Sequence, residues 1–194
     1  MSFLMTAFVV AQLQLGVRIY DSVGVSPAEL DRARASAAAI LTSAGIEPIW
    51  RPCHVDACIG PVKPHEIAIR IVRSSPASEK DSLGFSVIDV PRRRGSLGTI
   101  YEDRVRDLAS QAGVEIGDLL GRAMVHEIGH MLIGTPGHSR FGLMRAVWAS
   151  SELRRGLPFD WVFSRSEASE LRRQLMARTL ALVPPEPVMV SAVQ

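Results

Sequence analysis

The segment His126-Glu127-Ile128-Gly129-His130 constrains this chain more than any other, because its spacing suits a helix with two histidines on one face. In a helix, residues four apart stack about one turn apart, so both imidazoles can reach a single metal ion. Glu127 then lies beside that ion, where a metal-activated water needs a base. The pattern therefore predicts a helix that carries two metal ligands and an acid–base group.

The neighbouring sequence supports a metal site over two histidines that merely pack in the core. Three of the five histidines, at positions 126, 130 and 138, fall within thirteen residues. The apolar residues around the first two predict a largely buried helix from about Asp118 to Ile133. Gly134 and Pro136-Gly137 should end this helix abruptly, and the turn can then bring His138 back toward the other two.

The composition is that of an ordinary globular protein, with 194 residues of which 47% are hydrophobic and 22% charged. This length is enough for one domain with a substantial core. The net charge of +2 gives no electrostatic case for a nucleic-acid partner. We therefore expect a single domain over residues 13–182, between an apolar N-terminus at 1–12 and a proline-rich flexible tail at 183–194.

The N-terminal segment contains an apolar run, Phe3 to Ala11, that is too short to span a bilayer. It lacks the basic start of a signal peptide, yet Ala7 and Ala11 are small residues of the kind that a cleavage site uses. Two interpretations stay open, a truncated export signal and a first strand with a flexible start. Stable membrane insertion is not expected from either.

Cys53 and Cys58 are the only cysteines and lie in a loop between Pro52 and Gly60-Pro61. Four intervening residues suit a disulfide that closes this loop. Such a bond persists in an oxidising compartment, which favours export to the periplasm or outside over a cytoplasmic location. A second metal site from Cys53, His54 and Cys58 is the weaker alternative, because its spacing is not that of a zinc knuckle.

Hydrophobic periodicity and turn residues predict an α/β (α+β) fold, a mixed twisted sheet of about five strands with an active-site helix and a C-terminal helix. Pro91 to Gly95, with its proline and three arginines, is not expected in a central strand. The opening strand, helix and strand favour parallel pairing. The predicted strands are Leu13–Tyr20, Ile46–Trp50, Glu66–Val72, Gly84–Val90 and Gly98–Tyr101, and the remaining helices are Ser26–Gly45, Asp103–Ala112, Trp148–Arg155 and Ser164–Thr179.

The stretch HEIGHMLIGTPGHSRFGLM resembles the zinc site of the metzincin metallopeptidases. His138-Ser139 followed by Met144 is similar to the matrixin form, in which a methionine turn follows the third histidine. The resemblance implies that His126, His130 and His138 bind zinc, that Glu127 is the general base, and that Met144 lies under the metal. It also implies that Gly98 to Tyr101 is the edge strand along which an extended substrate lies.

The spacing to the third histidine departs from the metzincin pattern, because Gly134 is four and His138 eight residues past His130, two residues more than the family has. An altered turn through Pro136 and Gly137 could absorb them. The alternative third ligand is a downstream carboxylate, as in thermolysin-like enzymes. Glu152 is the nearest candidate, followed by Glu167 and Glu170.

The same resemblance implies a reaction. Three protein ligands leave zinc one position for water, whose pKa falls to about 7. Glu127 would take its proton during attack on a peptide carbonyl and later deliver that proton to the leaving amine. We therefore expect a zinc metalloendopeptidase that hydrolyses peptide or protein substrates. A catalytically weak or inactive zinc-binding module of the same fold stays open as the alternative.

Overall fold

The computed structural model describes residues 13–53, 58–74 and 82–181, so the predicted N-terminal segment and the predicted tail both lie outside the described residues. A five-stranded sheet has the order β2-β1-β3-β5-β4, parallel except for the antiparallel pair β4 and β5. The predicted mixed sheet is therefore confirmed. Its strands are β1 (Leu13–Asp21), β2 (Ile46–Pro52), β3 (Glu66–Val72), β4 (Gly84–Asp89) and β5 (Arg94–Tyr101).

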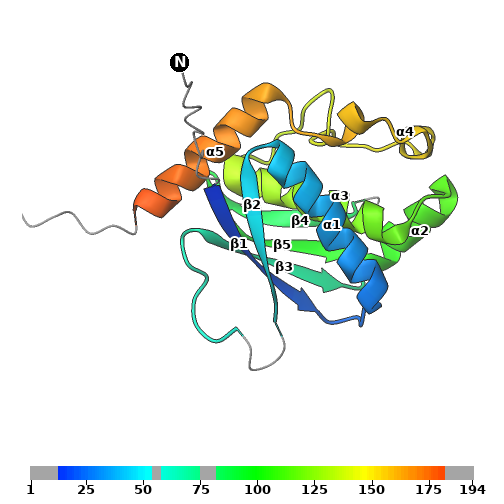
Figure 1. Cartoon of the computed structure of the whole chain (residues 1–194), viewed down its shortest axis with the longest axis horizontal. Helices are drawn as coiled ribbons and strands as arrows, with labels where there is room; N and C mark the ends of the chain where they lie inside the picture. The colour runs from blue at the N-terminus through cyan, green and yellow to red at the C-terminus, as the bar shows by residue number, and fades with distance from the viewer. Residues whose placement is uncertain (1–12, 54–57, 75–81, 182–194) are drawn as a thin grey trace, which may run out of the picture.

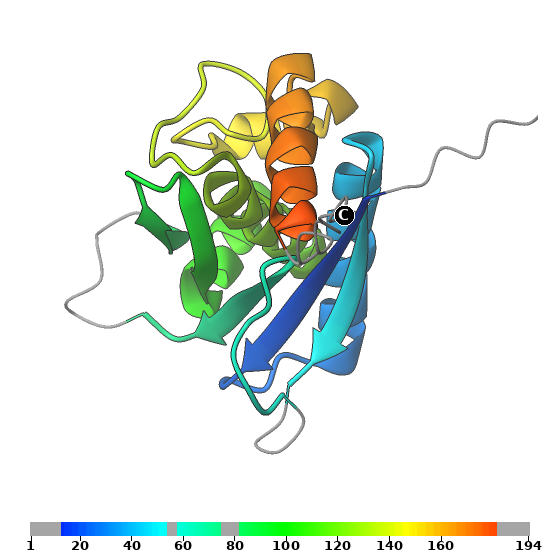
Figure 2. The ribbon, with the colours of Figure 1, turned by 90° about the vertical axis from the view of Figure 1, so that its left-hand side faces the viewer.

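Two long helices lie side by side against one face of this sheet (Figures 1 and 2). Helix α3 crosses over β4 and β5, and helix α1 covers β2 at the opposite edge of the sheet. The C-terminal helix α5 packs against α3, as Figure 2 shows. The helices are α1 (Pro27–Ser43), α2 (Glu102–Ala112), α3 (Ile116–Ile133), α4 (Ser150–Arg155) and α5 (Arg165–Leu180), with a short 3-10 turn at Pro158–Trp161.

The predicted helix ends are confirmed by their hydrogen bonds. Ser26 accepts from the backbone N–H of Glu29, whose carboxylate accepts from the Ser26 N–H in return. Ser164 and Glu167 form the same capping box at the start of α5. Because each box satisfies two N–H groups that the helix leaves unpaired, these short sequence patterns locate both helix starts.

Helix α3 is buried between α1 and the sheet because glycines permit close approach on both sides. A Cβ at Gly121 would come within 2.4 Å of the Ala33 carbonyl oxygen of α1. On the sheet, a Cβ at Gly98 would lie 3.2 Å from the Glu127 Cβ and 3.0 Å from Ile69 Cδ1. These contacts explain why α3 is apolar around most of its circumference. Even so, no helix within the described ranges is both long and apolar enough to cross a membrane.

Two predictions about β5 are wrong, namely where the strand begins and that it lies at the edge of the sheet. This strand begins at Arg94, not Gly98, since Arg94 and Gly95 pair with Asp89 and Ile88 across a hairpin. Arginine is tolerated there because β3 pairs only from Leu97 onward, which leaves Arg94 exposed at the strand end. The edge strand is consequently β4, whereas β5 lies inside the sheet between β3 and β4.

The two cysteines are joined as the expected disulfide, with Cα atoms 5.4 Å apart. The alternative prediction, a metal site that uses the thiolates of Cys53 and Cys58, is therefore wrong. The chain that follows Cys58 is held by Arg18 of β1, which donates to the carbonyl oxygens of Gly60 at 2.9 Å and Pro61 at 3.0 Å. The same guanidinium forms a buried ion pair with Glu66 at 2.6 Å.

Candidate metal centre and active site

His126 and His130 project from the same face of α3, and their imidazole orientations are fixed by backbone carbonyls. The Nδ1 of His126 lies 3.0 Å from the Leu143 carbonyl oxygen, and that of His130 lies 2.8 Å from the Thr135 carbonyl oxygen. A carbonyl only accepts, so each Nδ1 carries the hydrogen and each Nε2 keeps a free lone pair. The two Nε2 atoms lie 3.0 Å apart, so both lone pairs converge on one point, an arrangement that a cation stabilises.

The electrostatic environment keeps both imidazoles neutral. Burial, together with the neighbouring His130 and His138, lowers the pKa of His126 to about 4, although the Leu143 carbonyl opposes the shift. Burial likewise lowers the pKa of His130 below its ordinary value. Since a metal binds the neutral ring, both side chains are in their ligand form at neutral pH.

The chain reverses at Gly134, which has a left-handed φ of 72°, and this turn brings His138 to the other two histidines. One ligand atom from each of the three rings lies within 4.8 Å of the others. Nitrogens bound tetrahedrally to one zinc ion are separated by about 3.4 Å. The donor set therefore fits zinc after a small approach of His138, which is exposed whereas His126 and His130 are buried.

The longer spacing to His138 is accommodated by a turn with its own hydrogen bonds. The Thr135 hydroxyl accepts from the Gly137 N–H at 3.1 Å, while its carbonyl holds His130. Beyond the histidine, the Ser139 N–H donates to the Met144 carbonyl at 2.8 Å, and its hydroxyl donates to Glu167. The two residues that this chain has beyond the metzincin spacing thus lie in a turn that hydrogen bonds hold in place.

The carboxylates considered as alternative ligands are engaged elsewhere. Glu152 accepts from the Ala149 N–H at 3.1 Å and lies 3.7 Å from Arg145. Glu167 accepts from the Ser164 N–H at 2.7 Å. Glu170 pairs with Arg173 at 2.6 Å. Among the described residues, none of these carboxylates joins the histidine cluster, whereas His138 does.

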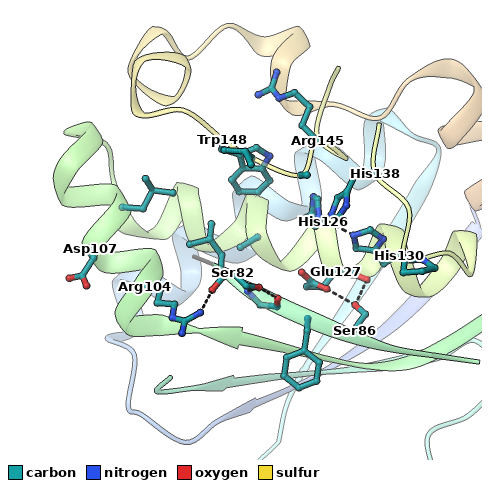
Figure 3. Close-up of a pocket in the computed structure, with 18 of the residues that line it drawn as sticks. Ser82, Ser86, Arg104, Asp107, His126, Glu127, His130, His138, Arg145 and Trp148 are labelled. Carbon is teal, nitrogen blue, oxygen red and sulfur yellow. Dashed lines mark hydrogen bonds between the residues drawn. The ribbon is translucent and has the colours of Figure 1, made fainter. Parts of the chain in front are cut away.

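Glu127 lies between the histidines and the edge strand β4, as Figure 3 shows. Its carboxylate accepts a hydrogen bond from the Ser86 hydroxyl at 2.6 Å, and its side chain is buried. Burial raises the pKa of Glu127 to about 7, although the Ser86 hydrogen bond acts in the opposite direction. A carboxyl group with such a pKa can both take and give a proton near neutral pH.

Met144 packs against α3 at Gly129. It is 1% exposed, and a Cβ at Gly129, between the two histidines of α3, would come within 2.5 Å of its Sδ atom. Phe163 lies against the same glycine, at 2.9 Å from that Cβ position. The methionine therefore packs directly on the helix backbone that carries the candidate ligands.

The fold resembles that of an archaemetzincin. The solved structure of archaemetzincin from Methanopyrus kandleri matches 87% of this chain and 99% of its own, with a TM-score of 0.57 and 14% sequence identity. The sequence itself matches no protein-family model and none of the curated proteins. At this identity the likeness shows the fold, so the mixed sheet with its helices is an archaemetzincin-like fold.

An aromatic cluster supports the candidate site of this archaemetzincin-like fold. The Trp148 ring meets His126 edge-on at 5.5 Å between centroids and meets Trp161 at the same distance. Arg122 stacks over Trp161 at 4.3 Å, and Arg145 lies 5.3 Å from the same ring. Trp148 was expected to start a helix, but α4 begins at Ser150, and the tryptophan instead covers His126.

The site opens into a cleft of about 920 Å³ in front of Glu127 and the histidines. One wall comes from β4, including Gly84 and Ser86, and the other from the segment Arg145–Trp148. Leu108 of α2 and Ala123 of α3 also line it. The cleft thus gives solvent and an extended ligand access to the histidine cluster.

The sequence did not identify the groups that orient the site. Ser86, Trp148 and the carbonyls of Leu143 and Thr135 all act through tertiary contacts with α3. The carbonyls leave no sequence signal, because any residue type supplies one. Ser86 could be found only by knowing that β4 is the strand beside Glu127.

Proposed function

We propose that this protein is a zinc-dependent metallopeptidase. The observation that carries the proposal is the convergence of the His126 and His130 Nε2 atoms, 3.0 Å apart, with His138 nearby and Glu127 beside them. A donor set of three imidazoles is one that zinc uses in catalytic sites, where three protein ligands leave a position open. The archaemetzincin-like fold agrees with this assignment.

Each residue then has a defined task. His126, His130 and His138 would hold the ion, and the carbonyls of Leu143 and Thr135 would keep the first two rings aligned. Zinc, when bound, polarises a carbonyl and lowers the pKa of water to about 7. Glu127 would accept the proton of the attacking water and pass it to the leaving amine.

The substrate in this proposal is an extended peptide segment that pairs with the edge strand β4. This strand stands at the end of the sheet and lines the cleft with Gly84 and Ser86. Main-chain pairing at a sheet edge supplies affinity with little dependence on sequence. We therefore expect hydrolysis of unfolded or flexible protein chains in preference to compact ones.

The matrixin-like arrangement and an exported location are further parts of the proposal. The matrixin-like arrangement is supported by the hydrogen bond from the Ser139 N–H to the Met144 carbonyl. The Cys53–Cys58 disulfide favours an oxidising compartment. A test is the redox state of these cysteines in protein recovered from its native cells, where free thiols would count against export.

A zinc-binding module without turnover is the second candidate, and the exposure of His138 favours it. A third ligand held at the surface constrains the geometry of the ion less than a buried one does. In this case the chain would bind zinc and peptides without cleaving them.

Glu127→Gln separates the two candidates because it removes the base and keeps the shape of the side chain. Wild type and variant would be loaded with equal zinc and assayed on an unfolded protein substrate and a broad peptide library. A metallopeptidase should lose at least about 100-fold in kcat at unchanged zinc content. Equal rates near zero for both proteins would favour the binding module.

A further inference from the structure

Ser86 is the residue of β4 that contacts Glu127. Along this strand, Gly84, Phe85, Ser86 and Ile88 line the cleft, and the side chains of Phe85 and Val87 are exposed. The Ser86 Oγ lies 2.6 Å from Glu127 Oε2 and 3.0 Å from the Glu127 backbone oxygen. A hydroxyl has one hydrogen, so the shorter contact identifies the carboxylate oxygen as the main acceptor.

Small residues on the sheet hold the Glu127 side chain close to this hydroxyl. A Cβ at Gly84 would lie 3.4 Å from Glu127 Oε1, and one at Gly98 would lie 3.2 Å from its Cβ. Within the described part of the chain, Ser86 is the side-chain donor that reaches Oε2. No described donor is bonded to Oε1, which is therefore the oxygen left to exchange a proton in the cleft.

We propose that Ser86 is a positioning residue for Glu127, whose carboxylate it holds beside the candidate metal site by a hydrogen bond to Oε2 (Figure 3). This inference rests on the proposed peptidase function. A glutamate side chain has three rotatable torsions, and fixing them in advance removes an entropic cost from the reacting geometry. The edge strand would thus contribute to proton transfer as well as to substrate binding.

If the Ser86 hydroxyl formed only a structural hydrogen bond, substitutions at Ser86 would have different effects from those of a positioning residue. Loss of a structural hydrogen bond would lower stability, and through it zinc content and activity together. Loss of a positioning contact should lower kcat alone, because neither the histidines nor the β4 backbone changes. The two roles can therefore be separated by measuring zinc content, KM and kcat on the same preparations.

The test compares Ser86→Ala, which removes the hydroxyl, with Ser86→Thr, which restores it. Ser96→Ala, at an exposed position on the adjacent strand β5, is the matched control. With zinc-loaded protein and one peptide substrate, we expect Ser86→Ala to lower kcat about 10-fold at unchanged KM and zinc content. Ser86→Thr should recover most of that loss, and Ser96→Ala should equal wild type.

Crystal structures of zinc-loaded wild type and Ser86→Ala supply a readout that does not depend on turnover. We expect one Glu127 conformer, bonded to Ser86, in wild type, and several conformers in Ser86→Ala. Three results would overturn the positioning role. They are an unchanged kcat in Ser86→Ala, a fall in kcat that follows zinc content or KM, and a Ser86→Thr variant as impaired as Ser86→Ala. If zinc-loaded wild type hydrolyses nothing, the proposed function fails, and an unchanged Glu127 conformer in Ser86→Ala would refute the positioning role separately.

Discussion

Gly129 of α3 lies directly against the thioether of Met144, and a Cβ at residue 129 would approach the Sδ atom to 2.5 Å. The contact joins α3, which carries His126 and His130, to the segment around Met144. This segment also belongs to the candidate site, because its Leu143 carbonyl orients His126. The distance between the helix and this turn is therefore set by the absence of a side chain at residue 129.

Gly129→Ala should disturb this contact. Alanine favours a helix over glycine by about 1 kcal/mol, but overpacking against Met144 and Phe163 costs about 1–3 kcal/mol. We expect a net destabilisation of up to about 2 kcal/mol in urea unfolding, with weaker zinc binding. Because the cost arises at Met144, the double variant Gly129→Ala/Met144→Ala should be less destabilised than the two single changes added together. Strict additivity would contradict a direct clash.

His138→Ala and Glu152→Gln decide the identity of the third ligand. Loss of a hydrogen-bond partner of a ligand costs about 10–100-fold in metal affinity, so loss of a ligand should cost more. We expect His138→Ala to weaken zinc binding more than 100-fold in competition with a chromophoric chelator. Glu152→Gln should keep wild-type affinity, because Glu152 caps α4 away from the cluster. The opposite order would assign the third ligand to Glu152.

Local signals in the sequence were sufficient for most of the secondary structure. The capping box at Ser26 and the left-handed glycine at Gly134 each satisfy backbone groups within a few residues, so the helix ends could be predicted from short patterns. The alternation in Glu66–Val72 likewise located β3 to the residue. The spacing of His126 and His130 predicted their shared face for the same reason, because helix geometry alone sets it.

Relationships between distant segments were beyond the sequence. The place of β5 inside the sheet depends on the hairpin to β4, and nothing in Gly98–Tyr101 distinguishes an edge strand from an inner one. Trp148 was expected to begin a helix, whereas its ring covers His126, twenty-two residues earlier in the chain. Ser86 is forty-one residues from Glu127, so their hydrogen bond becomes visible only in the folded chain.

The Cys53–Cys58 disulfide should stabilise the fold without affecting the candidate site. Closing so short a loop contributes about 2 kcal/mol through the unfolded chain. We expect the double change Cys53→Ser/Cys58→Ser to lower the free energy of unfolding by about that amount and to leave zinc affinity unchanged. Dithiothreitol should destabilise wild type to the same extent and have no effect on the double variant. A reductant effect on the double variant would point to another cause.

Glu66 should make the stability of the fold depend on acid pH. Burial alone would raise the pKa of this carboxyl, but the Lys63 N–H and the guanidinium groups of Arg18 and Arg51 hold it below its ordinary value of 4.5. A folded-state pKa below the unfolded one stabilises the fold fully above pH 4.5, and this stabilisation is lost as the pH falls through the folded value.

Glu66→Gln should accordingly destabilise the protein by about 3 kcal/mol at pH 7, because Arg18 stays buried without its carboxylate. The gap between wild type and variant should narrow below pH 4.5, where wild type loses the same charge. Asp118→Asn, which breaks the partly exposed ion pair with Arg32, is the control and should cost less than about 1 kcal/mol. The free energy of unfolding of all three proteins can be measured in urea from pH 7 to pH 3. If it changes with pH in parallel for wild type and Glu66→Gln, the stabilising role of the Glu66 charge is refuted.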